Sequence, residues 1–429
     1  MSARVRLRGA RRSAGLRTAV PLVTVLLAAT ACGGPATHVH PEAPLPSATT
    51  GHGTETLRSG SPLPGRGTAT PSATPSAPAA ACADRIFSGM TPAQRVGQLF
   101  MGGVSAAHPD QTQLRTLRDY HVGSLMLTGR SSAGTKATRR LVDGVRGQAD
   151  QVGGRRVGML VATDQEGGQV QVLSGPGFSV MPSALTQGSW STTTLRTRAA
   201  VWAGQLKAAG VDLDLAPVAD VVPASLGTRN GPIGHYFREY GHAPDTVASH
   251  SGAFAAGFAR AGVMTTLKHF PGLGQVLGNT DTTANVVDSV TTASSASLTP
   301  FRSGIRAGSP FVMVSLARYT KIDPGHLAVF SPTVIGRLLR TELGFHGVVI
   351  SDDLGQAVAV RSYTPAQRAV NFLAAGGNMI LTVRPSTVPA MAQAVQGRMK
   401  QDASFRTQVN DSVHRILAAK VNAGLLACG

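Results

Sequence analysis

The sequence predicts a single (β/α)8 barrel, in which eight parallel strands close on themselves and helices cover the outside. Three observations support this fold class. Eight short apolar or β-branched runs recur over about 350 residues, and segments with helical patterning separate them. The runs are almost continuously apolar rather than alternating, which is typical of parallel strands buried on both faces. A doubly wound open sheet fits the same pattern and is the alternative fold.

Expected strands and helix boundaries alternate along this part of the chain. The strands are expected near residues 98–103, 123–129, 157–164, 211–220, 262–270, 310–318, 347–353 and 378–383. Helices are expected to start at Thr91-Pro92, Ser331-Pro332 and Thr364-Pro365, where an N-cap residue precedes a proline at the first helical position. Gly210 and Gly344 follow apolar-periodic stretches and are expected to end helices.

An export signal is expected at the N-terminus. Residues 1–17 are rich in arginine, and residues 18–31 form an uncharged, mostly apolar run of 14 residues. This length suits a secretory signal, whereas a membrane-spanning helix needs about 20 residues. The run ends in Ala29-Thr30-Ala31-Cys32, which resembles a bacterial lipobox. We therefore expect residues 1–31 to be a lipoprotein signal peptide and Cys32 to anchor the exported protein to the extracytoplasmic face of the membrane. Plain secretion is the alternative.

A tether is expected over residues 32–81. The segment 33–81 carries 9 of the 26 prolines and is rich in Ser, Thr, Ala and Gly. Such a composition cannot bury enough apolar surface to fold, so the segment is expected to be disordered. Its HVHPE stretch lacks a fixed scaffold, and we expect neither a metal nor a cofactor. The folded domain is expected to span residues 82–429.

The charge and the cysteines indicate the environment. The net charge is +18, from 40 Lys and Arg against 22 Asp and Glu, but the arginines of the folded part are scattered and only 5% of residues are aromatic. We therefore expect no nucleic-acid partner and a favourable contact with anionic envelope polymers. The protein is also expected to be a monomer. Cys82 and Cys428 bracket the folded part, and an exported protein meets an oxidising compartment. A disulfide between them is expected, with two buried free thiols as the alternative.

Polar side chains follow several of the expected strands. They are Asp164, Asp220, Lys268, His269, Asp352 and Asp353. In a barrel the carboxyl ends of the strands converge on one mouth, where active sites are built. The sequence therefore predicts a polar site at that mouth.

Four segments resemble one enzyme family. Residues 267–274 (LKHFPGLG) resemble the KHFPGHG signature of family 3 glycoside hydrolases, in their single-barrel β-N-acetylglucosaminidase branch. Residues 163–168 (TDQEGG) resemble that branch's DQEGG loop, and residues 338–354 are similar to LLREELGFDGVVISDDL. The start, residues 90–100, resembles the family's opening helix and first strand. The resemblance covers about residues 83–425.

The resemblance implies roles for individual residues. Asp352 stands at the position of the family's nucleophile. Asp164, Arg238, Lys268 and His269 match positions that hydrogen-bond sugar hydroxyls. A retaining glycosidase needs such a carboxylate and a separate proton donor. Beside these, Asp353 is expected to cap the following helix or hold a strand end, and Asp220 to make loop hydrogen bonds beneath the mouth. An Asp352-Asp353 metal site is the less favoured alternative.

The departures from the family pattern bear on the chemistry. The branch carries Asp-Ser-His after the KHFPG loop, with histidine as acid/base, and this chain has Asn279-Thr280-Asp281 there. We expect Asp281 to be the acid/base on a loop able to swing over the sugar, with Asn279 orienting it and contacting substrate. Other departures are Gln169 and Val172 for two arginines, Leu273 and Leu316 for histidines, and Asn378 for an aspartate.

Two function classes follow. The first is an exo-acting retaining β-glycosidase, a β-N-acetylhexosaminidase acting on cell-wall-derived glycans, with β-glucosidase-like specificity as a variant. The second is a catalytically impaired lipoprotein that binds sugars or muropeptides. The carboxyl group of Asp281 favours the enzyme because an acid remains where the reaction needs one.

Overall fold

All eight predicted strands pair in parallel in one sheet of the computed structural model, which describes residues 77–426. They are β1 (Phe100–Ser105), β2 (Ser124–Thr128), β5 (Leu160–Thr163), β8 (Leu213–Asp214), β9 (Met264–Phe270), β11 (Phe311–Val314), β13 (Val348–Ser351) and β14 (Ile380–Thr382). Their order is β13-β11-β9-β8-β5-β2-β1-β14, and a parallel bridge between Ile350 and Met379 joins the two ends of the sheet. The predicted (β/α)8 barrel is confirmed, and the open sheet is wrong.

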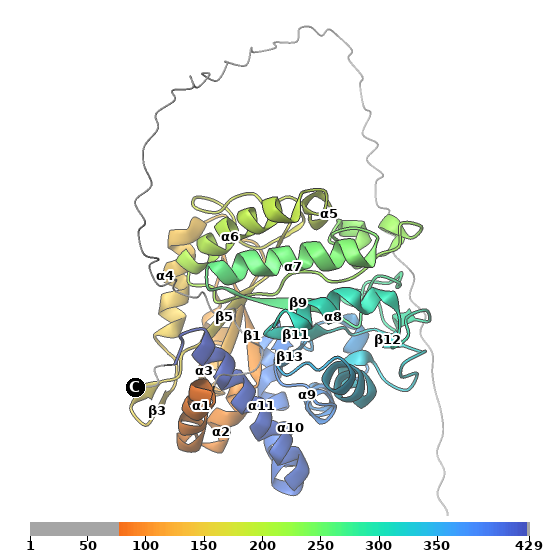
Figure 1. Ribbon diagram of the computed structural model, residues 1–429. Coiled ribbons are helices and arrows are strands. Elements are labelled where there is room, and N and C mark those ends of the chain that lie inside the picture. The colour runs from red at the N-terminus through yellow and green to blue at the C-terminus, as the bar shows by residue number, and fades with distance from the viewer. Residues whose placement is uncertain (1–76, 427–429) are drawn as a thin grey trace, which may run out of the picture. The chain divides into compact units, whose positions relative to one another are not determined.

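Helices cover the outside of the barrel, with α6 and α7 side by side along one flank (Figure 1). The α-helices are α1 (Ala77–Gly89), α2 (Pro92–Gln98), α3 (Gln111–Asp119), α4 (Gly134–Arg146), α5 (Ala184–Gln187), α6 (Thr192–Ala208), α7 (Pro244–Arg260), α8 (Thr299–Arg306), α9 (Pro365–Ala374), α10 (Val388–Gln401) and α11 (Ala403–Asn422). A further helix is η5 (Thr333–Glu342), and the short ones are η1 (Gly227–Arg229), η2 (Gly234–Tyr236), η3 (Ala296–Leu298), η4 (Ala328–Phe330), η6 (Val358–Val360) and η7 (Pro385–Thr387).

The predicted helix boundaries are confirmed by their hydrogen bonds. Thr91 and Thr364 each form a capping box with the glutamine three residues later. The Oγ of Ser331 accepts a hydrogen bond from the backbone N–H of Val334 at 3.0 Å. Gly210 and Gly344, after α6 and η5, have φ of +85° and +68°, a left-handed conformation that favours glycine.

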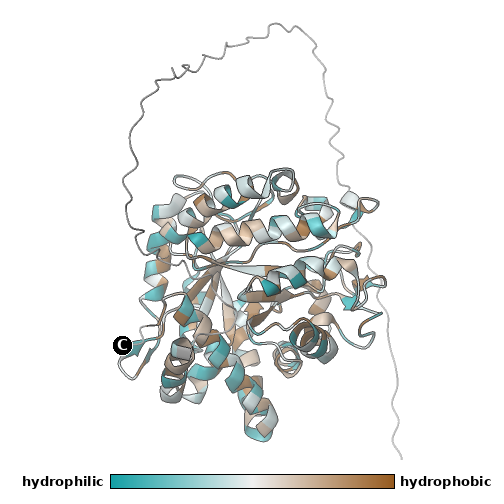
Figure 2. Cartoon of the chain, viewed as in Figure 1, coloured by the Kyte–Doolittle hydropathy of each residue, from teal (hydrophilic) through white to brown (hydrophobic). Residues whose placement is uncertain are grey.

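The apolar runs of the sequence form the core, and the outer helices carry many hydrophilic residues (Figure 2). Most strands are shorter than predicted, and β8 differs most: it spans two residues, whereas residues 211–220 were expected. Pro217 follows β8 and has no N–H to donate to a neighbouring strand. The chain rejoins the sheet through a bridge between Val218 and Lys268.

Three short two-stranded sheets lie in the loops of the described chain. They are β3 (Gln151–Val152) with β4 (Arg155–Arg156), β6 (Gln165–Gly167) with β7 (Val170–Gln171), and β10 (Val287–Asp288) with β12 (Arg318–Tyr319). The β6–β7 hairpin directly follows β5 and therefore stands at the mouth of the barrel.

The start of the folded part differs from the prediction. Helix α1 begins at Ala77, so the expected boundary at residue 82 falls inside a helix. Its apolar residues Ala79, Ala83 and Ile86 are buried, which explains why this end of the expected tether folds. Cys82 is buried and disulfide-bonded, while Cys428 and Cys32 lie outside the described residues. The Cys82–Cys428 pairing and the anchor at Cys32 therefore stay predictions. In residues 77–426, no helix combines the length and apolarity needed to cross a membrane.

Candidate active site

A cleft of about 490 Å³ opens at the carboxyl ends of the strands. Seven predicted site residues line it together: Asp164, Arg238, Lys268, His269, Asn279, Asp281 and Asp352. They come from β9, from the ends of β5 and β13, and from the loops after β8 and β9. Segments far apart in the sequence thus meet where the strand pattern predicted.

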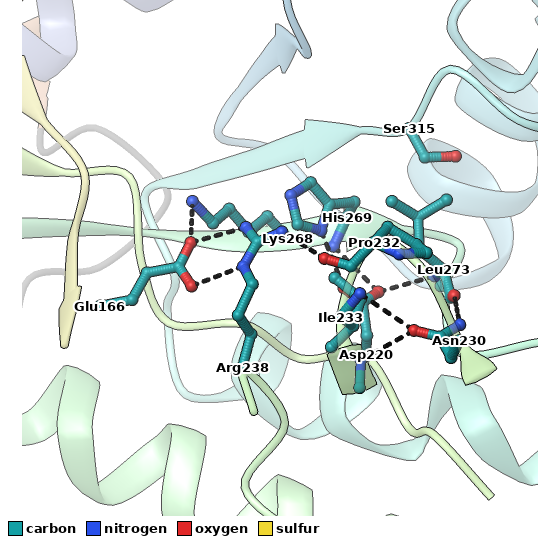
Figure 3. A network of polar contacts seen from close by, with 12 residues as sticks. Glu166, Asp220, Asn230, Pro232, Ile233, Arg238, Lys268, His269, Leu273 and Ser315 are labelled. Carbon is teal, nitrogen blue, oxygen red and sulfur yellow. Dashed lines mark hydrogen bonds and ion pairs between the residues drawn. The ribbon is translucent and has the colours of Figure 1, made fainter. Parts of the chain in front are cut away.

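One wall of the cleft is a network of two cations and two carboxylates. Lys268 Nζ lies 2.6 Å from Asp164 Oδ1 and 2.5 Å from Glu166 Oε1. Arg238 donates to both oxygens of Glu166, from Nη2 at 2.7 Å and from Nε at 2.9 Å. Figure 3 shows Glu166 between the lysine and the arginine. Because the positive and negative charges balance, this wall can offer donors and acceptors to sugar hydroxyls without a buried unpaired charge.

Glu166 is the part of this network to which the sequence analysis gave no role. Its side chain is 3% exposed, and burial opposes its ionisation. Arg238 and Lys268 nevertheless lower the pKa of Glu166 to about 2. Burial would lower the pKa of Lys268, but Asp164 and Glu166 outweigh it and raise that pKa. The signal for Glu166 was its place two residues after Asp164, which in extended chain puts both side chains on one face.

His269 is held from below by Asp220. His269 Nδ1 lies 2.8 Å from Asp220 Oδ2, so Nδ1–H donates to this carboxylate and leaves Nε2 as the second ring nitrogen. The other oxygen, Oδ1, accepts from the backbone N–H groups of His269 at 3.1 Å and Leu273 at 2.8 Å. Asp220 is fully buried. The prediction that Asp220 holds a loop beneath the mouth is confirmed, and orienting His269 is an additional contact.

The two adjacent aspartates after β13 have different surroundings. Asp353 accepts from the backbone N–H groups of Gly355 (2.8 Å), Val383 (3.0 Å) and Gln356 (2.9 Å), so both of its oxygens hold the loop, as predicted. Asp352 accepts from the N–H of Asp353 at 2.7 Å through Oδ1. Its Oδ2 has no such bond. Among the described residues, no group of three or more His, Cys, Asp or Glu side chains is placed to hold a metal ion.

Asp281 lies on the loop between β9 and β10, which we call the acid loop (residues 271–286). Asn279 Oδ1 accepts from the backbone N–H of Asp281 at 2.9 Å, so Asn279 shapes a turn and does not bond the Asp281 carboxylate. The carbonyls of Thr280 and Asp281 accept from the N–H groups of Ala359 and Val358, both at 3.1 Å. The expected orienting bond to the carboxylate is thus wrong. The expectation that the acid loop swings over the sugar does not agree with these bonds either, because they tie the loop to the segment after Asp352.

The two candidate catalytic carboxyl groups, Asp281 and Asp352, have different charges around them. The Asp281 side chain faces the open cleft. The protein around the carboxyl group nevertheless shields it from water, and this loss of solvation, together with the negative charge of Asp352, raises its pKa to about 6. Burial also raises the pKa of Asp352, while the positive potential of His269 and Lys268 favours its ionised form. The groups beside Asp352 thus favour the ionised form that a nucleophile needs, and the raised pKa of Asp281 favours the protonated form that an acid needs.

The departures from the family pattern have structural explanations at two places. Arg130, from the loop after β2, reaches the hairpin that lacks the two arginines and donates to the carbonyl of Gln169 at 2.6 Å. Arg130 also lines the cleft and supplies a positive charge there from a different segment of the chain. The sequence analysis did not identify this residue. Leu273 and Leu316, in place of histidines, are buried in the core.

Comparisons with known proteins agree with this geometry. Residues 91–419 match the glycosyl hydrolase family 3 N terminal domain. A "Beta-hexosaminidase" of Stenotrophomonas maltophilia is 36% identical over 254 residues, which cover 57% of this chain and 73% of that protein. The crystal structure of a β-N-acetylhexosaminidase from Beutenbergia cavernae has a TM-score of 0.75 and 47% identity, covering 77% of this chain and 99% of that chain. A family 3 β-N-acetylglucosaminidase from Paenibacillus has a TM-score of 0.69 and 28% identity, covering 78% of this chain and 63% of that chain.

Proposed function

The chain belongs to glycosyl hydrolase family 3, and from this premise we propose that it is a retaining β-N-acetylhexosaminidase with Asp352 as nucleophile and Asp281 as acid/base. The glycosidase class and the β-N-acetylhexosaminidase activity rest on the relatives just described. The observation that carries the residue assignment is the cleft itself. It holds the carboxyl group of Asp352, which accepts a hydrogen bond from the N–H of Asp353, and the carboxyl group of Asp281, whose pKa is raised to about 6.

The proposed reaction has two steps. In the first, a carboxylate oxygen of Asp352 attacks the anomeric carbon while Asp281 gives its proton to the departing glycosidic oxygen. This step breaks the glycosidic bond and forms a glycosyl–Asp352 ester. In the second step, the ionised Asp281 takes a proton from water, and the water oxygen replaces Asp352 at the anomeric carbon. Two inversions leave the β configuration unchanged.

Binding of the sugar is assigned to the wall that carries Asp164, Lys268 and Arg238. Asp164 and Lys268 offer one acceptor and one donor close together, at 2.6 Å from each other, and Arg238 keeps further N–H groups beside them. His269 is oriented by Asp220 and can use Nε2 toward a hydroxyl. Hydroxyls bound by such preorganised groups position the anomeric carbon against Asp352.

The substrate source and the location are further parts of the proposal. We propose exo-acting release of N-acetylhexosamine from cell-wall-derived glycans by a monomer held outside the cell by a lipid on Cys32. The arginine-rich start, the 14-residue apolar run and the net charge of +18 support it. A processed, detergent-partitioning protein that Cys32→Ala releases or leaves unprocessed would agree with the anchor. A fully soluble mature form that starts elsewhere would contradict it.

Hydrolysis of nitrophenyl sugars tests the activity. We expect nitrophenol release from the β-N-acetylglucosaminide to exceed release from the β-glucoside, and Asp352→Asn to abolish it without loss of the folded state. Release from the glucoside alone would instead favour the β-glucosidase-like specificity. If the protein binds sugar but releases nitrophenol from neither substrate, the alternative function, a noncatalytic sugar-binding lipoprotein, would be the better explanation.

A further inference from the structure

We propose that Asn230 is a positioning residue that holds the acid loop so that Asp281 reaches the glycosidic oxygen. Asn230 follows η1, at the start of the segment that leads to Arg238, and it does not line the cleft. The inference rests on the proposed function, since it takes Asp281 as the acid. It adds a residue that acts on proton delivery from outside the cleft.

Asn230 has every hydrogen-bonding position of its amide occupied. Its Nδ2 donates to the carbonyls of Leu273 at 2.7 Å and Val276 at 2.8 Å, both in the acid loop. Its Oδ1 accepts from the N–H groups of Ile233 at 3.0 Å and Gly234 at 2.9 Å, in its own loop. A primary amide offers two donors and two lone pairs, so this side chain is saturated. Figure 3 shows it between the two loops.

The backbones of the two loops also approach each other closely beside Asn230. The N–H of Gly231 donates to the carbonyl of Leu277 at 3.1 Å. A Cβ at residue 231 would lie 2.5 Å from that oxygen, so the contact requires glycine there. Because Asn230 is 0% exposed, water does not replace its bonds freely, and their loss would leave two buried carbonyls without a donor.

The sugar-binding wall shares the turn at Ile233 with Asn230, because the backbone N–H of Arg238 donates to the carbonyl of Ile233 at 3.2 Å, but the Arg238 guanidinium also has contacts outside that turn. Arg238 is fixed by its paired bonds to Glu166 and by the carbonyl of Pro232, which Nη1 reaches at 2.8 Å. The stretch from Leu273 to Val276, in contrast, takes its side-chain support from Asn230 and Asp220. Because Glu166 still holds the Arg238 guanidinium when Asn230 is removed, we expect that change to disturb the acid loop, and through it Asp281, more than the groups that hold the sugar.

The test compares two substrates with different leaving groups in Asn230→Ala and Asn230→Asp. Loss of proton delivery slows cleavage of an N-acetylglucosamine disaccharide, whose leaving oxygen needs a proton. It affects a nitrophenyl glycoside far less. We expect kcat/KM to fall about 10-fold or more for the disaccharide, since a displacement of 1 Å can cost about 10²-fold, and about 3-fold or less for the nitrophenyl substrate. Asn230→Asp should act more strongly, because a carboxylate oxygen would replace Nδ2 against the carbonyls of Leu273 and Val276.

Asn378 provides a matched control. It is also a buried amide, bonded to Arg340 Nη2 (2.5 Å), the N–H of Val349 (2.9 Å) and Ser412 Oγ (3.0 Å), but it lies just before β14, where that strand begins, away from the mouth. Asn378→Ala should lower the midpoint of thermal unfolding and leave the ratio of the two rates as in the wild type. A general loss of packing would change the ratio of the disaccharide rate to the nitrophenyl rate in the same way in the Asn230 and Asn378 variants. A positioning role would change this ratio only in the Asn230 variants.

The outcomes separate this inference from the proposed function. If Asp281→Asn changes the ratio of the two rates but folded Asn230→Ala lowers both rates equally, the inference is wrong and the acid assignment stands. If Asp281→Asn leaves the ratio unchanged, the proposed acid is wrong. Should Asn230→Ala and Asn230→Asp fail to fold, Asn230→Ser retains one hydroxyl donor and carries the comparison. Failure of all three to fold would overturn the inference, because Asn230 would then determine the fold.

Discussion

Replacing Asp281 with asparagine removes the proposed acid while keeping the shape of the side chain. In the wild type the pKa of Asp281 is raised to about 6, so its carboxyl group keeps its proton to a higher pH than an ordinary aspartate does. An amide has no proton to give. The backbone bonds of Asp281 to Val358 and Asn279 do not involve its carboxyl group, so the loop should keep its conformation.

The expected loss depends on the leaving group. General acid catalysis contributes roughly 10²- to 10⁴-fold, so hydrolysis of an unactivated disaccharide by Asp281→Asn should fall by at least about 10²-fold. Formation of the glycosyl–enzyme from a nitrophenyl substrate needs little help from an acid and should be largely spared. Its hydrolysis, which needs Asp281 as base, should slow, and azide should restore turnover by attacking the anomeric carbon to give a β-glycosyl azide.

The pH profile gives a second measurement of the same assignment. Asp281 must be protonated for the first step, so kcat/KM should decline as pH rises through about 6. Asp352 must be ionised, so kcat/KM should also decline as pH falls through its own pKa, which lies above the ordinary value. Asp281→Asn should remove the decline on the alkaline side and retain the one on the acid side.

The control is Asp143→Asn, which removes an exposed carboxylate of α4 outside the cleft and should leave both substrates and the profile unchanged. Unchanged disaccharide hydrolysis by Asp281→Asn would refute the reasoning. His269, whose Nε2 is not held by Asp220, would then be the next residue to test.

Three further predictions concern the nucleophile, the core and the disulfide. A mechanism-based fluorosugar should label Asp352, as peptide mass mapping can show; a label on any other carboxylate would reassign the nucleophile. Burial and a neighbouring arginine lower the pKa of Arg340 to about 9, and its guanidinium is bonded to an amide, so Asn378→Asp should stabilise the fold by about 1–2 kcal/mol by pairing that charge. An unchanged or lower unfolding midpoint would contradict this. Non-reducing mass mapping should join Cys82 to Cys428, and a free thiol on either would exclude their bond.

Much of the fold and the place of the site followed from the sequence alone. Continuously apolar runs that alternate with helices are buried on both faces of a parallel sheet, so the eight strands could be located before the structure was known. Polar residues at the strand ends then had to meet at one mouth, and Asp164, Lys268 and Asp352 do. Helix starts were equally local, because an N-cap such as Thr91 bonds to a residue three positions away.

Only the tertiary structure decided which groups bond to one another. The contacts of Glu166 with Arg238, of Arg130 with the hairpin, and of Asn230 with the acid loop join segments between 39 and 72 residues apart. No local pattern encodes such pairs, since they depend on where separate loops come to rest and on which direction each donor points. The same reason explains Asn279: the sequence placed it beside Asp281, but the folded loop turned its oxygen to a backbone N–H instead of leaving it for the carboxyl group.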